Sequence, residues 1–204
     1  MESNDTFPET AVRCFGDLIG LRDIIARLRP LVQQARSRGL PLPHMLYYGN
    51  KGLGKKTCAT ALAAELVATA HHIRAVEMAH GTDLVGVLTK LGPGDLLVVE
   101  GFESAAPVLT TDPLFSDALS SYSVNITLDA GVHARTITMP LPPFTAIFLV
   151  DDASRLSKNQ RSLLRACDLE FAFGPYDDSE ISEIIRRAMS VRLPAMPPRR
   201  WRTY

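Results

Sequence analysis

The sequence predicts an α/β fold in which a five-stranded parallel sheet has helices on both faces and a β-hairpin is inserted before its fourth strand. A glycine-rich segment at 49–57 lies between a short apolar run and an alanine-rich helical stretch. Apolar runs of strand length alternate with helical patterns, which is typical of parallel sheets. Two short alternating runs around a glycine, at 125–139, interrupt this order. These features predict a doubly wound sheet with its ligand site at the carboxyl ends of the strands.

The segment 49–57, G-N-K-G-L-G-K-K-T, matches a phosphate-binding loop at all but one position. In the pattern G-x-x-x-x-G-K-[ST], backbone N–H groups cradle phosphates, the lysine reaches the β- and γ-phosphates and the final hydroxyl ligates Mg²⁺. Lys56 stands at the hydroxyl position. The residues that supply the cradle and its charge are present: Gly49, Gly52, Gly54 and Lys55. The loop therefore predicts nucleotide binding and puts hydrolysis in doubt.

The first half of the chain supplies three strands. An amphipathic stretch at 21–38 precedes the apolar run 44–48, which ends at the loop as the motif requires. After the loop, an alanine-rich helix carries Ala59, Leu62 and Leu66 on one face. Further elements are predicted in this order: a second strand at 73–79, a helix at 82–91 capped by Thr82, a turn at 92–95 and a fully apolar third strand at 96–100.

The second half adds the hairpin and two more strands. The period of two on both sides of a glycine predicts an antiparallel hairpin at 125–139. The other predicted elements are a helix at 113–122, a buried strand at 144–150, a helix at 157–167, a last strand at 169–173 and a helix at 177–189 with acids first and arginines last.

Composition narrows the class of protein. Hydrophobic residues make up 46% of the 204 positions, enough for one domain with a real core, and 22 basic residues balance 22 acidic ones. No apolar run reaches the length of about 18 residues that a membrane span needs, and the N-terminus is acidic, unlike a secretory signal. Three widely spaced cysteines indicate reduced thiols. We expect a soluble, cytoplasmic protein.

Two smaller features carry expectations of their own. The five histidines show no metal-ligand spacing, and the pair His71–His72 is predicted to lie in a solvated turn after a helix. The segment 191–204 is rich in proline and arginine. Its composition favours a disordered tail, and an arm that contacts phosphates is the alternative.

From about Phe15 to Met189 the chain resembles RuvB, the family of AAA+ motors that drive Holliday-junction branch migration with RuvA. The hairpin and the segment after it are the most specific part of this likeness. The similar segments are F-G-D-L-I-G, R-G-L-P-L-P-H-M-L-Y-Y-G, L-G-P-G-D-L-L-V-V-E, Y-S-V-N-I-T-L, L-P-P-F-T and E-I-I-R-R-A. The resemblance implies an N-terminal segment at 1–12, an AAA+ P-loop core at 13–190 and a tail at 191–204. The family's helical lid and winged helix are expected to be absent.

The resemblance implies ATP or ADP as the ligand. Arg13 and Ile19, with Val12, match positions that contact adenine, although the family's Arg-Pro pair is missing, and Tyr176 matches a tyrosine of the nucleotide pocket. The loop residues expected to contact phosphate are Gly49, Gly52, Gly54, Lys55, Lys56 and Thr57.

The positions that carry catalysis in the family differ here. Its third strand ends in Asp-Glu, of which the Asp helps to hold Mg²⁺ and the Glu orients the attacking water; this chain has Glu100 and Gly101. The polar sensor after the fourth strand falls near Val150 and Asp151, where a carboxylate would repel a γ-phosphate. Losing a base or a transition-state donor typically costs on the order of 10²–10⁴ in rate.

Some residues could compensate for these changes. Thr57 and Glu100 are the candidate metal ligands, Glu103 could replace the base, and Mg²⁺ binding is doubtful. For an arginine finger the candidates are Arg161 and Arg165, of which Arg165 is preferred. Alternatively, the Lys56 ammonium neutralises phosphate charge in place of Mg²⁺, which predicts tight but unproductive binding.

Three functions remain open. The first is a pseudo-ATPase that binds nucleotide and acts through protein contacts, capturing a RuvA-like protein or other AAA+ subunits on the hairpin 125–139, with a ring oligomer allowed. The second is a working ATPase subunit in DNA recombination. The third is a folded relic without activity. The hairpin itself is an ordinary sheet extension if its apolar face packs on the core and a docking site if that face is exposed. We expect DNA contact to be indirect or through the tail.

Overall fold

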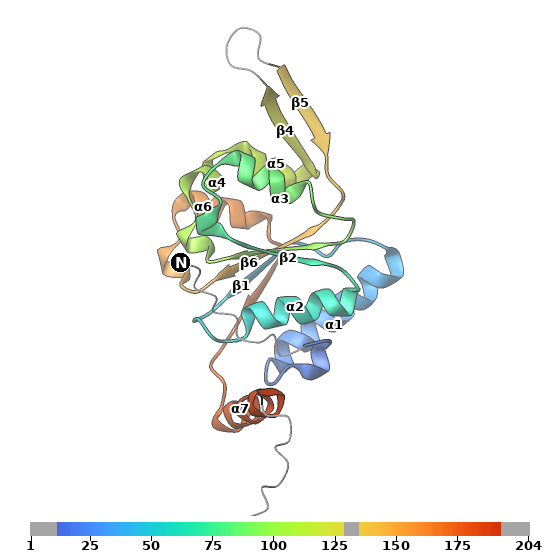
Figure 1. Cartoon of the computed structure of the whole chain (residues 1–204), viewed down its shortest axis with the longest axis vertical. Coiled ribbons are helices and arrows are strands. Elements are labelled where there is room, and N and C mark those ends of the chain that lie inside the picture. Colours follow the sequence, from blue (N-terminus) through green and yellow to red (C-terminus); the bar gives the residue numbers. More distant parts are fainter. Residues whose placement is uncertain (1–11, 129–134, 193–204) are drawn as a thin grey trace, which may run out of the picture.

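The computed structural model describes residues 12–128 and 135–192. Five parallel strands form the central sheet in the order β2-β3-β6-β1-β7 (Figure 1). In chain order these strands are β1 (Met45–Tyr48), β2 (Ala70–Arg74), β3 (Leu96–Glu100), β6 (Thr145–Val150) and β7 (Leu169–Ala172). The predicted α/β fold is therefore confirmed.

Helices cover both faces of this sheet because alternate strand side chains point to opposite sides. In β3, Leu96 and Val98 pack with α1 (Arg22–Arg38) and α2 (Lys55–Leu66), while Leu97 and Val99 belong to the core on the other face. The helices of that other face are α3 (Gly81–Leu88), α4 (Pro107–Thr111), α5 (Pro113–Ser121) and α6 (Lys158–Leu163) (Figure 1). Burial on both faces explains why the central strands are fully apolar.

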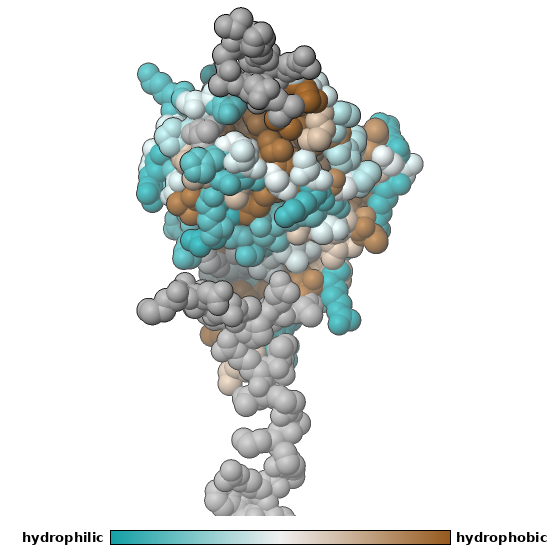
Figure 2. All heavy atoms as spheres, turned by 45° about the horizontal axis from the view of Figure 1, so that its top comes forward, coloured by the Kyte–Doolittle hydropathy of each residue, from teal (hydrophilic) through white to brown (hydrophobic). Residues whose placement is uncertain are grey.

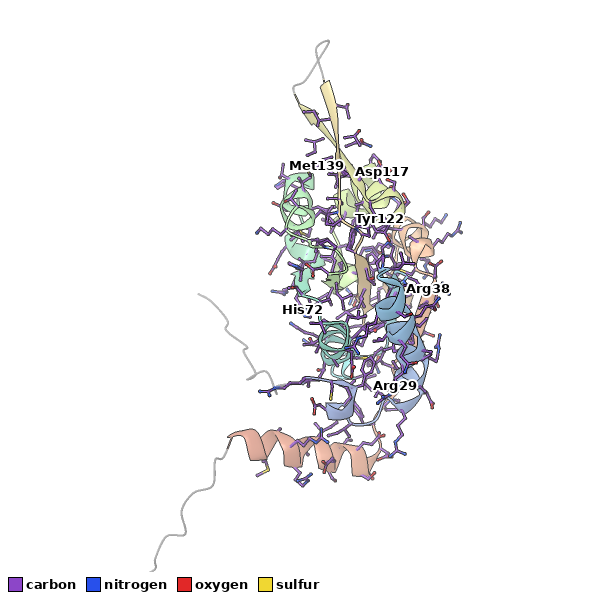
Figure 3. The ribbon with its side chains drawn as sticks, turned by 90° about the vertical axis from the view of Figure 1, so that its right-hand side faces the viewer. Arg29, Arg38, His72, Asp117, Tyr122 and Met139 are labelled. Carbon is purple, nitrogen blue, oxygen red and sulfur yellow. The ribbon has the colours of Figure 1, made fainter. Side chains whose placement is uncertain are left out.

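Short 3₁₀ helices occupy several connections. They are η1 (Phe15–Asp17), η2 (Ala75–Glu77), η3 (Phe102–Ser104), η4 (Ala153–Arg155) and η5 (Leu164–Ala166). Helix α7 (Asp178–Arg192) lies beyond the α1 side of the sheet (Figures 1 and 3). One tie to the core is the Arg187 guanidinium, which donates to the backbone oxygen of Asp17 at 2.6 Å. Within the described residues, none of the helices combines the length and apolar character needed to cross a membrane.

The predicted hairpin is confirmed as a separate two-stranded antiparallel sheet, β4 (Ser123–Leu128) and β5 (Arg135–Pro140), which projects from the body (Figure 1). Its base is anchored, because Val124 is fully buried and its cross-strand partner Met139 packs against the core. Further out, Ile126 still touches the core, whereas its partner Ile137 is 51% exposed. Hydrophobic side chains gather at this end of the molecule (Figure 2).

The second strand was predicted in the wrong place. It spans Ala70–Arg74 and not 73–79, and the chain turns into η2 directly after it. His71 and His72 therefore lie in an edge strand and not in a solvated turn. Helix α3 starts at Gly81, so its cap is His80 and not Thr82, and Asp83 accepts the His80 N–H at 2.9 Å.

Some predictions fall on segments that the structure does not describe. Residues 1–11, 129–134 and 193–204 contain most of the predicted N-terminal segment, the predicted glycine turn between the two runs of 125–139 and most of the predicted tail.

Candidate functional site

The phosphate-binding loop joins β1 to α2, and its backbone has a conformation that requires glycine. Gly49, Gly52 and Gly54 have φ angles of +141°, +89° and +81°, all in the region that side chains rarely adopt. At Gly49 a side chain would also collide with the backbone oxygen of Phe173. Helix α2 begins at Lys55, so the positive end of its dipole faces the loop. These are the features that an anion cradle needs.

Lys55 is folded into this loop. It is 6% exposed, and its ammonium donates to the carbonyl oxygens of Gly49 and Asn50, the latter at 2.9 Å. The same ammonium forms an ion pair of 2.7 Å with Oδ1 of Asp151. The lysine is thus in place for phosphate, and a carboxylate already pairs with it. A phosphate that binds Lys55 must displace or share this partner.

Asp151 follows β6 and is held from the neighbouring strand connection. Its backbone N–H donates to Oε1 of Glu103 at 3.1 Å. The other oxygen of that carboxylate, Oε2, is buried and has no hydrogen-bond partner among the described residues. Glu103, which sequence reasoning considered as a substitute base, therefore positions the chain at Asp151 in this structure.

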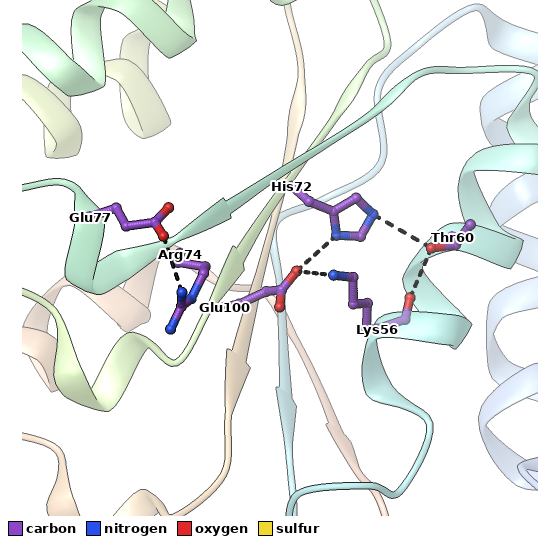
Figure 4. Close-up of polar contacts among 6 residues, drawn as sticks. All are labelled: Lys56, Thr60, His72, Arg74, Glu77 and Glu100. Atoms are coloured by element: carbon purple, nitrogen blue, oxygen red, sulfur yellow. Dashed lines mark hydrogen bonds and ion pairs between the residues drawn. The ribbon is translucent and has the colours of Figure 1, made fainter. Parts of the chain in front are cut away.

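A second ion pair lies at the end of β3 (Figure 4). The Lys56 ammonium is 2.9 Å from Oε1 of Glu100, and Nδ1 of His72 is 3.2 Å from the same oxygen. The His72 ring also reaches Thr60, whose hydroxyl lies 3.5 Å from Nε2. The hydrogen bond from His72 and the Lys56 charge lower the pKa of Glu100, although its partial burial opposes them. Glu100 is accordingly a carboxylate at neutral pH.

The other candidate catalytic positions lie as follows. Gly101 is the N-cap of η3 and adopts a left-handed conformation with φ +65°. As a glycine it offers only backbone at the position where the resemblance implies a base. Arg161 donates to the carbonyl oxygens of Leu156 and Ala153, at 3.1 and 3.2 Å. Arg165 lies in η5 and is exposed. Its accessibility suits a residue that acts on a neighbouring subunit, and that role stays a prediction.

Thr57 is exposed on α2, one residue beyond Lys56. Successive residues of a helix are about 100° apart, so Thr57 lies a quarter of a turn round from Lys56, whereas Thr60 is its neighbour at i, i+3. The metal-ligand role of Thr57 stays a prediction.

Tyr176 connects the loop to the other side of the predicted nucleotide pocket. Its hydroxyl donates to the Leu53 carbonyl oxygen at 3.2 Å, and its ring packs against Gly20. A cavity of about 530 Å³ lies beyond Gly20 and includes Ile19 in its wall, but not Arg13. The other residues that line it are Phe15, Gly16, Leu18, Arg22, Ile25, Ala26, Arg29, Ser179, Glu180 and Glu183. The Arg13 backbone N–H instead donates to Asp17 at 2.7 Å.

The structure thus brings most predicted site residues to one edge of the sheet. Lys55, Lys56, Glu100 and Asp151 form two adjacent ion pairs there. Sequence reasoning missed His72, because it placed this residue in a turn. No signal in the sequence marked it: His72 is level with Val98, two residues before Glu100 on the same face of the sheet, and only the pairing of β2 with β3 brings the two side chains together.

Comparisons with known proteins agree with this geometry. The family described as "Holliday junction DNA helicase RuvB P-loop domain" matches residues 11–166. The chain is 33% identical over 180 residues to the Holliday junction branch migration complex subunit RuvB of Oleidesulfovibrio alaskensis. This alignment covers 88% of this chain and 54% of the relative. It is 31% identical over 171 residues to the corresponding subunit of Rhodopirellula baltica, covering 84% of this chain and 45% of the other.

Solved structures give the same result. Two mutant forms of Thermotoga maritima RuvB superpose with TM-scores of 0.74 at 25% and 26% identity. Each alignment covers 88% of this chain, and 55% or 54% of the solved chain. The chain spans about half the length of the relatives it matches.

Proposed function

Because this chain belongs to the RuvB P-loop domain family, we propose that it is a nucleotide-binding module that hydrolyses ATP poorly or not at all. It acts through protein contacts, in a process related to the Holliday-junction branch migration named for its relatives. The observation that carries the proposal is a contrast between two parts of the site. The phosphate cradle is intact, whereas at the carboxyl ends of β3 and β6, here called the catalytic edge, Glu100 and Asp151 are paired with Lys56 and Lys55.

Binding is supported by the backbone of the loop. Three glycines hold the cradle conformation, α2 directs its N-terminus at the loop, and the Lys55 ammonium is in place. A phosphate would bind through backbone N–H groups and one buried cation, which is the ordinary chemistry of such a site. ATP and ADP are the proposed ligands, and their adenine is proposed to bind on the side of Ile19 and Tyr176.

Poor hydrolysis is supported by three positions. Gly101 has no side chain that could orient a water, Asp151 places a negative charge on the phosphate-binding lysine, and Lys56 fills the position of a metal-ligating hydroxyl. Phosphoryl transfer depends on positioning and on stabilisation of developing negative charge, and each of these changes weakens one of the two.

One observation favours a second candidate function, an active ATP-hydrolysing subunit of a DNA recombination or repair helicase. Glu103 follows β3 closely, and its Oε2 is buried without a hydrogen-bond partner among the described residues. If a rearrangement on assembly released Glu103 from Asp151, it would offer a carboxylate near the site. Arg165 would then be the residue that completes a neighbouring subunit's site.

The hairpin is the proposed contact surface for a RuvA-like protein or for other AAA+ subunits. Its exposed outer part, with Ile137, offers apolar area that the core does not cover, and its base is fixed rigidly by Val124 and Met139. Figure 3 shows Met139 near the base of the hairpin, at the same end of the molecule as Tyr122 and Asp117. We further propose that the protein forms a ring oligomer and contacts DNA only indirectly. In the proposed domain division, residues 13–190 form the P-loop core of the chain, and segments at 1–12 and 191–204 flank it.

Calorimetric titration of the full chain with ATP and with ADP, each with Mg²⁺, tests the proposal. We expect saturable binding of both nucleotides. The matched control is Lys51→Thr, which changes an exposed lysine of the same loop and should bind like the wild type. If neither nucleotide binds, the proposal is contradicted and the P-loop fold does not serve nucleotide binding in this protein.

A further inference from the structure

The metal expected at a phosphate-binding loop does not fit the residues of this one. Mg²⁺ takes oxygen ligands in a near-ideal octahedral arrangement, and the loop normally supplies a hydroxyl at the position of Lys56. An ammonium has no lone pair to offer a metal. Across residues 12–128 and 135–192, no group of three or more His, Cys, Asp or Glu side chains is placed to hold a metal ion.

The geometry instead puts a protein cation beside the carboxylate that would face the metal. The Lys56 ammonium lies 2.9 Å from Oε1 of Glu100, at the end of β3 (Figure 4). His72 approaches the same oxygen from the edge strand, so the carboxylate is held from two sides. Lys56 remains 60% exposed, and Glu100 occupies one of the three N–H donors of its ammonium.

We propose that the Lys56 ammonium takes the place of Mg²⁺, so that this site binds nucleoside phosphates without a divalent cation. The inference rests on the proposed nucleotide binding and adds how the phosphate charge is balanced. Lys55 contacts the phosphate from within the loop, and Lys56 contacts it from the first turn of α2 while Glu100 holds its side chain in position. His72 is a positioning residue that keeps Glu100 directed at Lys56.

This arrangement has a consequence for affinity. A lysine supplies one positive charge where Mg²⁺ supplies two, and each ammonium at the site is paired with a carboxylate. The additional negative charge of a γ-phosphate therefore gains little at this site, and ADP should bind about as well as ATP. A Mg²⁺ ion complexed by the nucleotide adds a charge that Lys56 repels, so it gives no gain in affinity.

The test is calorimetric titration of the full chain with ADP in the presence of EDTA and, separately, of Mg²⁺. For the wild type we expect the two dissociation constants to agree within about threefold. The variant Lys56→Thr restores the hydroxyl of the motif and removes the cation. With EDTA it should bind ADP on the order of tenfold more weakly, and Mg²⁺ should recover most of that loss. Lys51→Thr, the same substitution at an exposed loop position, should behave like the wild type in both buffers.

The possible outcomes separate this inference from the proposed function. Wild-type binding that appears only with Mg²⁺ would overturn the inference and leave nucleotide binding intact. Unchanged affinity of Lys56→Thr with EDTA would also overturn it. Absence of binding in both buffers would remove the proposed function itself. Circular dichroism verifies that Lys56→Thr is folded, as expected for a change at an exposed helix position.

Discussion

The phosphate cradle and the catalytic edge lie side by side at the carboxyl ends of the strands, yet they differ from the family's motifs to different degrees. The cradle consists mostly of backbone, whose shape depends on Gly49, Gly52 and Gly54. The edge consists of side chains at the ends of β3 and β6, where Glu100 and Asp151 now pair with lysines of the loop. A site built on backbone tolerates change around it, because its hydrogen-bond donors do not depend on the identity of neighbouring side chains.

The two regions also differ in what substitution would cost the fold. Gly49 packs against the backbone after β7, so the cradle is part of the architecture. Lys56 and Asp151 are 60% and 41% exposed and can change with little effect on packing. Substitution of these two side chains therefore leaves the packing and the anion cradle intact.

The largest expected effect comes from breaking the cradle itself. Gly49→Ala puts a side chain at φ +141° and against the Phe173 carbonyl, so we expect a loss of about 3 kcal/mol or more in the free energy of unfolding. Gly86→Ala is the control, since Gly86 lies inside α3 with open space around it and should become up to about 1 kcal/mol more stable. Urea denaturation measures both. Equal stability of the two variants would contradict the architectural role of Gly49.

Removing the cation inside the cradle has the next largest effect. Lys55→Ala deletes the buried ammonium, and we expect nucleotide affinity to fall on the order of 10- to 100-fold while the fold persists. Lys51→Ala removes the same charge from an exposed position of the same loop and should have little effect. Calorimetry compares the two. A similar loss in both variants would mean that only the overall charge of the loop matters.

His44, directly before β1, makes the stability of the fold depend on pH. The Ala146 N–H donates to Nδ1 at 3.0 Å, and Nε2 donates to the Leu119 oxygen at 2.9 Å, so the buried ring is neutral. Burial lowers the pKa of His44 below its ordinary value, although the Leu119 contact and Asp168 oppose this. Between the folded and unfolded pKa values the unfolded chain binds more protons, so stability is fully present above about pH 6.5 and falls as pH decreases below it.

Unfolding by urea at about pH 7.5 and about pH 5.5 measures this effect, which for a single histidine with an unfolded pKa of about 6.5 is at most about 1.4 kcal/mol. His44→Gln should lose most of the pH dependence, and His80→Gln, at an exposed position, should keep it. An unchanged pH dependence in His44→Gln would exclude His44 as its origin.

The smallest expected effect is the change in nucleotide affinity when Asp151, at the catalytic edge, is replaced. Asp151→Asn removes the carboxylate that competes for Lys55, so ATP affinity should rise about two- to tenfold, with a smaller gain for ADP. Asp152→Asn, next in sequence and exposed, should leave both affinities unchanged. A fall in ATP affinity in Asp151→Asn would show that Asp151 supports nucleotide binding.

The fold could be predicted well because its signals are local. A glycine-rich loop between β1 and α2, apolar strands at 96–100 and 145–150, and the alternating hairpin all appear in short windows of sequence. The second strand was misplaced because the alternation at 73–79 resembles a strand, while the real edge strand contains two polar residues, His71 and His72, which point to opposite faces of the sheet. An edge strand needs less apolar content than a central one, so composition gave little help there.

The site could be predicted only in part. Each of Lys56, Glu100 and Asp151 was recognisable as a departure from a motif. Their pairing could not be predicted, because Lys55 and Asp151 meet only when β1 and β6 lie side by side in the sheet. The role of Glu103 in holding the Asp151 backbone depends on the same spatial arrangement.

Phosphate release at saturating ATP and Mg²⁺, measured on a sample whose nucleotide binding has been established, tests the central claim most directly. The Lys55→Ala variant supplies the background. With Gly101 at the expected base position and Lys56 at the expected metal-ligand position, the proposal predicts binding with turnover below roughly 10⁻² per second. Release at about 1 per second or faster, as in a working motor, would contradict it and assign the water-orienting role to Glu103 or another residue of the site.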